Sequence, residues 1–92
     1  MNSKHKFCDD ELYETIASLS SAAEAKEFFA DLCSPSELAA FAQRLAAAKM
    51  LLSGCTYEQV IAATDISSAT LSRVSKCVKN GTGYRRALKA DK

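Results

Sequence analysis

The sequence has few of the residues on which enzyme chemistry depends. Its 92 residues include one histidine, one proline, three glycines and no tryptophan. The histidine, His5, lies near the N-terminus, where such a residue is typically exposed to solvent rather than catalytic. Three glycines do not supply a glycine-rich phosphate-binding loop. The sequence therefore predicts a protein that is not an enzyme.

The four cysteines are widely separated, at Cys8, Cys33, Cys55 and Cys77, and no zinc-ligand spacing occurs among them. The N-terminal stretch lacks the apolar core of a signal peptide, and no apolar run reaches the roughly 18 residues of a membrane span. We therefore expect a cytoplasmic protein with no metal and no membrane partner. Its thiols are expected to be reduced, most of them acting as small buried apolar groups.

Charge is unevenly distributed along the chain, although the formal net charge is only +1. Residues 1–65 contain five cationic and ten acidic side chains, whereas residues 66–92 contain seven cationic and one acidic. A basic segment on an otherwise acidic chain is typical of a protein that binds phosphate groups, such as those of nucleic acids. A solvated basic C-terminus is the simpler interpretation of the charge run taken by itself.

Helical periodicity and capping residues predict an all-α fold of six short helices. Residues 9–19 and 22–33 are each expected to form an amphipathic helix. The third helix begins after Ser34, with proline at its first position and Glu37 completing a capping box, and it ends before Ser53-Gly54. Five residues mark its core stripe: Leu38, Phe41, Leu45, Ala48 and Leu52. A last short helix is predicted over residues 84–90.

Residues 56–80 predict a helix-turn-helix, the unit that places its second helix in the major groove of DNA. Thr56 and Gln59 form a capping box for the first helix, which ends near Asp65. Ser67 caps the second helix, residues 68–80, whose core side is Leu71, Val74 and Val78. The N-terminal turns of such a helix reach base edges. The predicted DNA-contacting set is Thr56, Tyr57, Ser67, Ser68, Ala69, Thr70, Arg73, Lys76 and Lys79.

The segment GCTYEQVIAATDISSATLSRVSKCVKNGTGYRRAL, residues 54–88, closely resembles the C-terminal part of the Trp-repressor-like family. The likeness is to its short YerC/YecD-type branch, whose members read G-x-T-Y and then S-x-A-T-[IL]-S-R-V. The resemblance extends upstream through residues 34–54 and covers nearly all of the chain after Asp9. The sequence departs from the usual helix-turn-helix pattern at Asp65, where a glycine is common, and at Ile61, where a small residue is favoured.

The resemblance implies an intertwined homodimer in which helices four and five form the reading head. Within a single domain, residues 1–92, we expect a mobile tail over 1–8, a dimerisation core over 9–53 and 83–91, and a DNA-reading head over 56–80. Two heads on one dimer would meet successive major grooves about 34 Å apart on a near-palindromic operator. The expected partner is double-stranded DNA.

The resemblance also suggests where a small effector would bind. Ser34, Arg44 and Arg73 correspond to residues that hold tryptophan in the repressor that names the family. Val74 replaces a small glycine of that site and occupies space that an indole ring needs. We therefore expect that tryptophan is not the effector, that no cofactor is required, and that the two arginines serve phosphates or pair with Glu37 or Asp31.

The leading hypothesis is thus a dimeric, sequence-specific transcriptional regulator, more specifically a repressor. The alternative is a helical protein–protein adaptor built on the same dimer without DNA binding, which predicts an exposed apolar groove instead of a basic face. A reading domain of a replication initiator has a similar helical arrangement, but such domains usually accompany an ATPase, and the sequence contains no P-loop.

Overall fold

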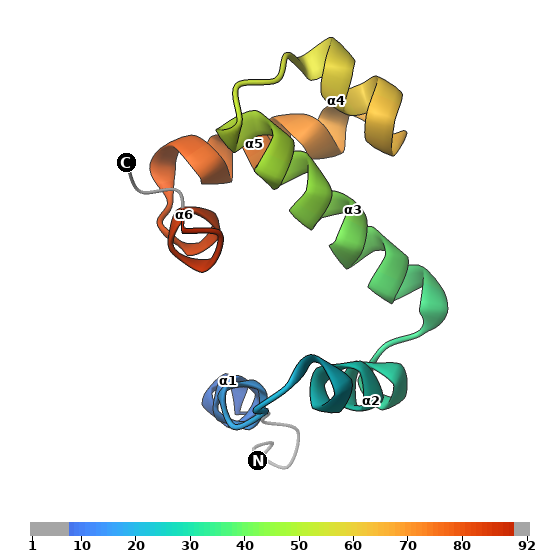
Figure 1. Cartoon of the computed structure of the whole chain (residues 1–92), viewed down its shortest axis with the longest axis vertical. Helices are drawn as coiled ribbons and strands as arrows, with labels where there is room; N and C mark the ends of the chain where they lie inside the picture. The colour runs from blue at the N-terminus through green and yellow to red at the C-terminus, as the bar shows by residue number, and fades with distance from the viewer. Residues whose placement is uncertain (1–7, 90–92) are drawn as a thin grey trace, which may run out of the picture. The chain divides into compact units, whose positions relative to one another are not determined.

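The computed structural model describes residues 8–89, and all regular elements in that range are α-helices (Figure 1). The chain divides between Pro35 and Ser36 into two compact units, which are described separately. The predicted mobile tail lies outside the described residues, apart from Cys8. The helices are α1 (Asp9–Ala17), α2 (Ala22–Leu32), α3 (Pro35–Leu52), α4 (Tyr57–Thr64), α5 (Ser68–Asn80) and α6 (Gly83–Ala87).

The first unit contains α1 and α2, neither of which has a buried residue. Ser21 caps α2, since its hydroxyl accepts the backbone N–H of Glu24 at 3.1 Å. The Glu24 carboxylate in turn accepts the backbone N–H of Ser20 at 2.8 Å and the Ser20 hydroxyl at 3.1 Å. Phe28 and Phe29 pack edge to face, with ring centroids 5.5 Å apart.

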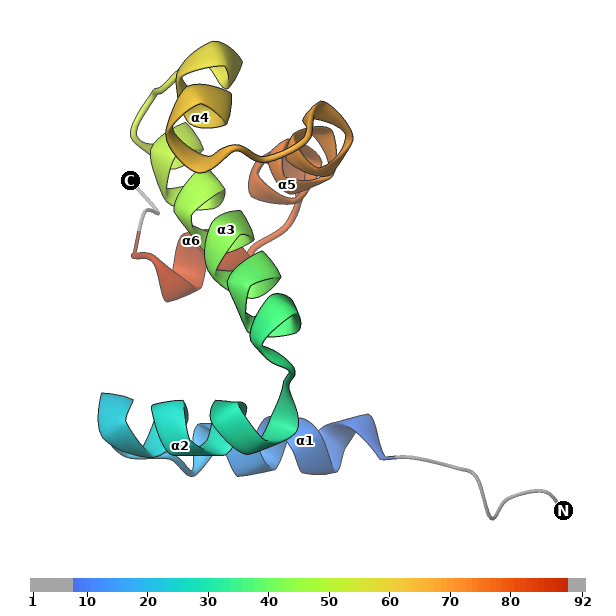
Figure 2. The same cartoon turned by 90° about the vertical axis from the view of Figure 1, so that its right-hand side faces the viewer.

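The second unit has a small apolar core where α4 and α5 gather about the C-terminal half of α3 (Figure 2). The predicted core side of α5 is confirmed, because Leu71, Val74 and Val78 are at most 6% exposed. Burial of each such side chain stabilises the fold by about 1.5–3 kcal/mol relative to exposure. This packing fixes which side of α5 faces the core, and the remaining side chains of α5 therefore face outward. The complete core cluster is Ala47, Ala48, Val60, Ile66, Leu71, Val74 and Val78.

The predicted core stripe of α3 is wrong for the single chain at three of its five positions. Leu38 is 40% exposed, and Phe41 and Leu45 are each 46% exposed. Ala48 is buried and Leu52 is half-buried. The periodicity identified one face of the helix, but only the last turns of that face, from Ala48 onward, pack against the core of α4 and α5.

Two further predictions need correction. The last helix ends at Ala87 instead of Ala90, which lies outside the described residues, and Lys89 has a left-handed φ of 56° that cannot continue a helix. None of the cysteines is buried: Cys8 and Cys77 are exposed, Cys33 and Cys55 are half-buried, and all four are free. Cys8, Cys33 and Cys55 lie just outside the helices, and Cys77 lies on the exposed side of α5, so none of them enters the core.

Within residues 8–89, no helix combines the length and the apolar character needed to span a bilayer.

Candidate nucleic-acid interface

The start of α4 is held by a reciprocal capping box at Thr56. The Thr56 hydroxyl accepts the backbone N–H of Gln59 at 3.1 Å, and the Gln59 side-chain oxygen accepts the backbone N–H of Thr56 at 2.8 Å. Thr56 and Tyr57 are both exposed, Tyr57 at 41%. Free amides at a helix start favour an anion, so this end of α4 suits a phosphate oxygen.

The turn between α4 and α5 depends on a left-handed residue. Asp65 adopts φ 61° and ψ 23°, and its N–H donates to the carbonyl of Ile61 at 2.8 Å. Gln43 on α3 reinforces the turn, because its side-chain nitrogen donates to the carbonyl of Thr64 at 2.9 Å. Ile61 packs, partly buried, against the core. The two departures from the usual helix-turn-helix pattern are therefore accommodated.

Ser67 caps α5 and begins the predicted reading surface. Its hydroxyl accepts the backbone N–H of Thr70 at 3.2 Å, which satisfies one of the free amides in the first turn. Ser67, Ser68 and Ala69 are exposed, whereas Thr70 is half-buried. Small side chains at the front of a helix allow its backbone to approach another surface closely.

Cations continue along the exposed side of the same helix. Arg73, Lys76 and Lys79 are all exposed, and α5 contains no acidic residue between its cap and Asn80. The predicted DNA-contacting set omits Ser72, although the helical periodicity already places this residue away from the core side of the helix. Ser72 is exposed and lies one turn from Ser68 and one turn from Lys76, and this i, i+4, i+8 spacing is the signal that adds it to the set.

The residues of the predicted effector pocket have different environments. Arg44 is half-buried, with its guanidinium carbon 5.4 Å from the centre of the Phe41 ring, a cation–π contact. Arg73 is exposed, and the neighbouring Val74 is 2% exposed within the core. Ser34 is exposed and belongs to the first unit. The effector pocket stays a prediction.

Comparison with known proteins agrees with this architecture. Residues 9–92 match the family described as Trp repressor protein. The chain belongs to the Trp repressor family. It is 42% identical over 80 residues to the uncharacterized protein YerC of Bacillus subtilis strain 168, covering 86% of this chain and 77% of YerC. The predicted resemblance and the all-α fold are thereby confirmed.

Two solved structures of bacterial proteins are similar to this Trp repressor family member, each with a TM-score of 0.83. One is a candidate Trp repressor from Staphylococcus aureus, 34% identical, covering 97% of this chain and 92% of that one. The other is a TrpR-like protein from Eubacterium eligens, 37% identical, covering 96% of this chain and 93% of that one. The Trp repressor family consists of DNA-binding regulators and not of enzymes, as the sequence predicted.

Proposed function

We propose that this Trp repressor family member binds double-stranded DNA sequence-specifically in the cytoplasm and represses transcription as a homodimer on a near-palindromic operator. The observation that carries the proposal is the division of α5 into two sides. Leu71, Val74 and Val78 anchor one side in the core, while the serine-capped front and three cations lie exposed. A helix anchored in this way can enter a groove without loss of its own packing.

The predicted DNA-contacting side chains of α5 divide into those suited to bases and those suited to phosphates. Ser68 and Ala69 are small, and Thr70 offers a methyl group and a hydroxyl to a thymine edge. Arg73 can bind a guanine through two parallel hydrogen bonds, a contact that discriminates by about 1–3 kcal/mol. Lys76 and Lys79, with the amides at the start of α4, would neutralise backbone phosphates and position the head.

A second copy of the chain would account for the apolar surface that the single chain leaves open. We propose residues 9–53 and 83–91 as the dimerisation core and residues 56–80 as the reading head. Leu38, Phe41 and Leu45 are each at least 40% exposed on one face of α3. Contiguous exposed apolar side chains of this kind are typical of an interface.

The dimer is tested by light scattering coupled to size exclusion. Leu45→Asp places a charge within the exposed stripe and is expected to give a monomer, because burial of an unpaired carboxylate is costly. Ala63→Asp is the matched control, since Ala63 is exposed in α4 and lies outside the proposed dimerisation core. A wild-type monomer, or equal effects of both substitutions, would remove the homodimer from the proposal.

DNA binding is tested by selection of bound sites from random duplex DNA with the purified full chain. The expected product has two inverted half-sites about one helical turn apart. If the dimer neutralises about six phosphates, the slope of log K against log salt should be near −5. A flat salt response, or a selected pool without a shared half-site, would contradict the proposal.

One alternative is a helical protein–protein adaptor built on the same dimer. It would use apolar side chains that the dimer leaves exposed to bind a different protein, and it would have no affinity for duplex DNA. Failure of the dimeric wild-type chain to retain any duplex at low salt would support the adaptor and exclude the regulator.

A further inference from the structure

We propose that the second unit contains a binding site for a small organic acid, placed on the side of α5 away from Arg73. The site is an open cavity of about 420 Å³ within the second unit. That volume is typical of ligand pockets. Its lining comes from the end of α3, the loop that follows it, the start of α4, the C-terminal half of α5 and one residue of α6: Leu51, Leu52, Cys55, Tyr57, Ser75, Val78, Lys79 and Arg85.

Ser75 is the residue that most directly indicates a ligand. It is 4% exposed and the only buried polar residue of the described chain, yet it lines the cavity. Within residues 8–89, its hydroxyl has no hydrogen-bond partner, whereas Thr15 and Thr64 on other helices both donate to the preceding turn. Every fully buried side-chain oxygen of the described residues has a hydrogen-bond partner. Because the Ser75 hydroxyl has none, part of the small exposed area of Ser75 must belong to this hydroxyl. A polar group of a molecule bound in the cavity would pair with it.

Two cations line the same cavity as Ser75. Arg85 is half-buried, and its Nε donates to the carbonyl of Val78 at 2.9 Å, which fixes the guanidinium beside α5. The two terminal nitrogens of Arg85 can still donate to an anion. A carboxylate fits best, because its two oxygens match the two parallel N–H groups of the planar guanidinium. Lys79 supplies a second charge. Acidic residues are absent from the lining, so an anion would meet no repulsion there.

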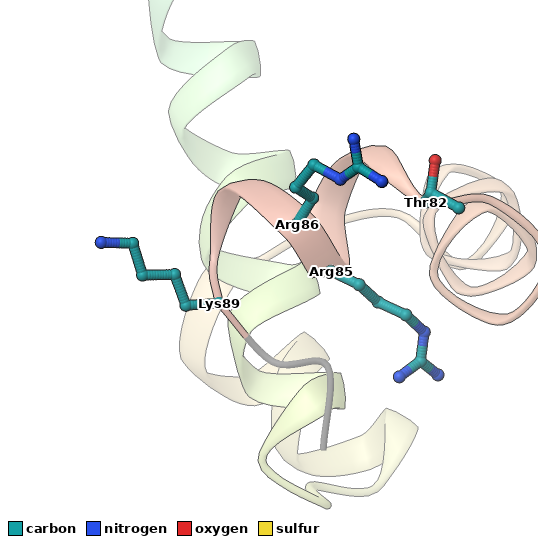
Figure 3. A pocket seen from close by; sticks show the side chains of 4 residues that line it. All are labelled: Thr82, Arg85, Arg86 and Lys89. Carbon is teal, nitrogen blue, oxygen red and sulfur yellow. The ribbon is translucent and has the colours of Figure 1, made fainter.

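The neighbouring basic cavity is a weaker anion site. It is lined by Thr82, Arg85, Arg86 and Lys89 and has a volume of about 350 Å³. Figure 3 shows the side chains of Arg85, Arg86 and Lys89 pointing in different directions instead of converging on one point. A single anion could therefore not be held by all three.

The lining specifies the chemical class of the ligand. Leu51, Leu52 and Val78 form an apolar wall, which favours an alkyl or aryl body. Arg85 and Lys79 favour a carboxylate at one end, and Ser75 adds a hydrogen bond. This arrangement is separate from the predicted tryptophan site, because Ser75 and Arg73 lie on roughly opposite sides of the helix.

The site would also regulate DNA binding, an extension that rests on the proposed function. Tyr57 and Lys79 belong to both the cavity lining and the predicted DNA-contacting set. A carboxylate bound beside Lys79 would compete with a DNA phosphate for the same charge. The acid and the duplex should therefore weaken each other's binding by the same factor.

Phenylbutyrate is a suitable probe, with the uncharged phenylbutanol as its matched control. The full chain, free of DNA, is titrated with each compound while its backbone amide resonances are recorded by NMR. We expect phenylbutyrate to shift the amides of the cavity lining and phenylbutanol to bind at least tenfold more weakly. Arg85→Gln should weaken phenylbutyrate binding about 10- to 100-fold, the range for loss of a charged hydrogen bond. Arg86→Gln should change it less than twofold.

Two further variants keep the test decisive. Ser75→Ala should weaken phenylbutyrate binding a few-fold. Lys79→Gln alters an exposed position and leaves the core intact, so it tests the site if Arg85→Gln fails to fold. Equal binding of the acid and the alcohol, equal effects at Arg85 and Arg86, or shifts confined to α1 and α2 would overturn the site. Duplex binding without phenylbutyrate binding would remove only this site, whereas the reverse result would remove only the proposed function.

Discussion

The side chain of Ser67 is tied to Thr70 by two hydrogen bonds. The Ser67 oxygen accepts the backbone N–H of Thr70 at 3.2 Å and donates its own proton to the Thr70 hydroxyl oxygen at 2.9 Å. One residue therefore both caps α5 and orients the hydroxyl that we expect to meet a base edge. The hydroxyl proton of Thr70 is therefore available for a hydrogen bond to the DNA, and it would favour a base edge that carries an acceptor.

Substitution of this cap should reduce stability and DNA binding together. Ser67→Ala is expected to lower the free energy of unfolding by about 1 kcal/mol, because a free N–H in the first turn of α5 loses its acceptor. Urea unfolding followed by circular dichroism measures the change. Ser68→Ala is the control and should stay within about 0.5 kcal/mol of wild type. Equal losses in both variants would show that the cap contributes nothing specific.

The turn at Asp65 should tolerate glycine and reject a β-branched side chain. Asp65→Gly is expected to leave the free energy of unfolding nearly unchanged, because the left-handed backbone costs glycine nothing. Asp65→Val should lower it by about 1–2 kcal/mol. Thermal and urea unfolding check both values. Ala62→Val, at an exposed position inside α4, should cost less than about 0.7 kcal/mol, and an equal loss there would contradict the role of the turn.

The reading-helix proposal predicts different consequences for two cations. Arg73→Ala should lower the preference for the selected operator over a scrambled duplex by about 1–3 kcal/mol. Lys89→Ala should weaken both duplexes slightly and equally, because a distant surface charge acts through the general field. Fluorescence anisotropy with the two duplexes at one salt concentration distinguishes these outcomes. The assignment of α5 fails if both variants change the two affinities alike.

Hydrogen bonds at the start of α2 lower the pKa of Glu24 below its ordinary value. The backbone N–H of Ser20 is the larger cause and the Ser20 hydroxyl the smaller. Since the folded pKa lies below the unfolded value of about 4.3, the stabilisation is present above that pH and is lost as the pH falls through the folded pKa.

Carboxyl-carbon NMR titration tests this relationship. Ser20→Ala should raise the pKa of Glu24 but leave it below the ordinary value, because the backbone donor remains. Glu24→Gln should reduce the loss of stability that occurs as the pH falls through the folded pKa of Glu24. An unchanged pKa in Ser20→Ala would show that the hydroxyl has no part in the effect.

Local signals predicted most of the helix boundaries. Proline at the start of α3, the capping box at Thr56 and the cap at Ser67 depend on neighbours within three or four residues, and each begins its helix where expected. The end of α6 was missed because no local stop signal precedes the left-handed Lys89. The cavity at Ser75 was missed for another reason, since it depends on which other helices surround that side of α5.

The sequence by itself determined the helical class, the family, the capped reading helix and the concentration of positive charge after residue 65, because these depend on residue order over short distances. Tertiary structure decided which apolar positions enter a core and which stay open. Apolar residues recur at helical spacing along α3 from Leu38 to Leu52, yet Leu38, Phe41 and Leu45 stay exposed and only the last turns pack against the core. Burial requires a second surface, and residue spacing specifies a face without specifying what covers it.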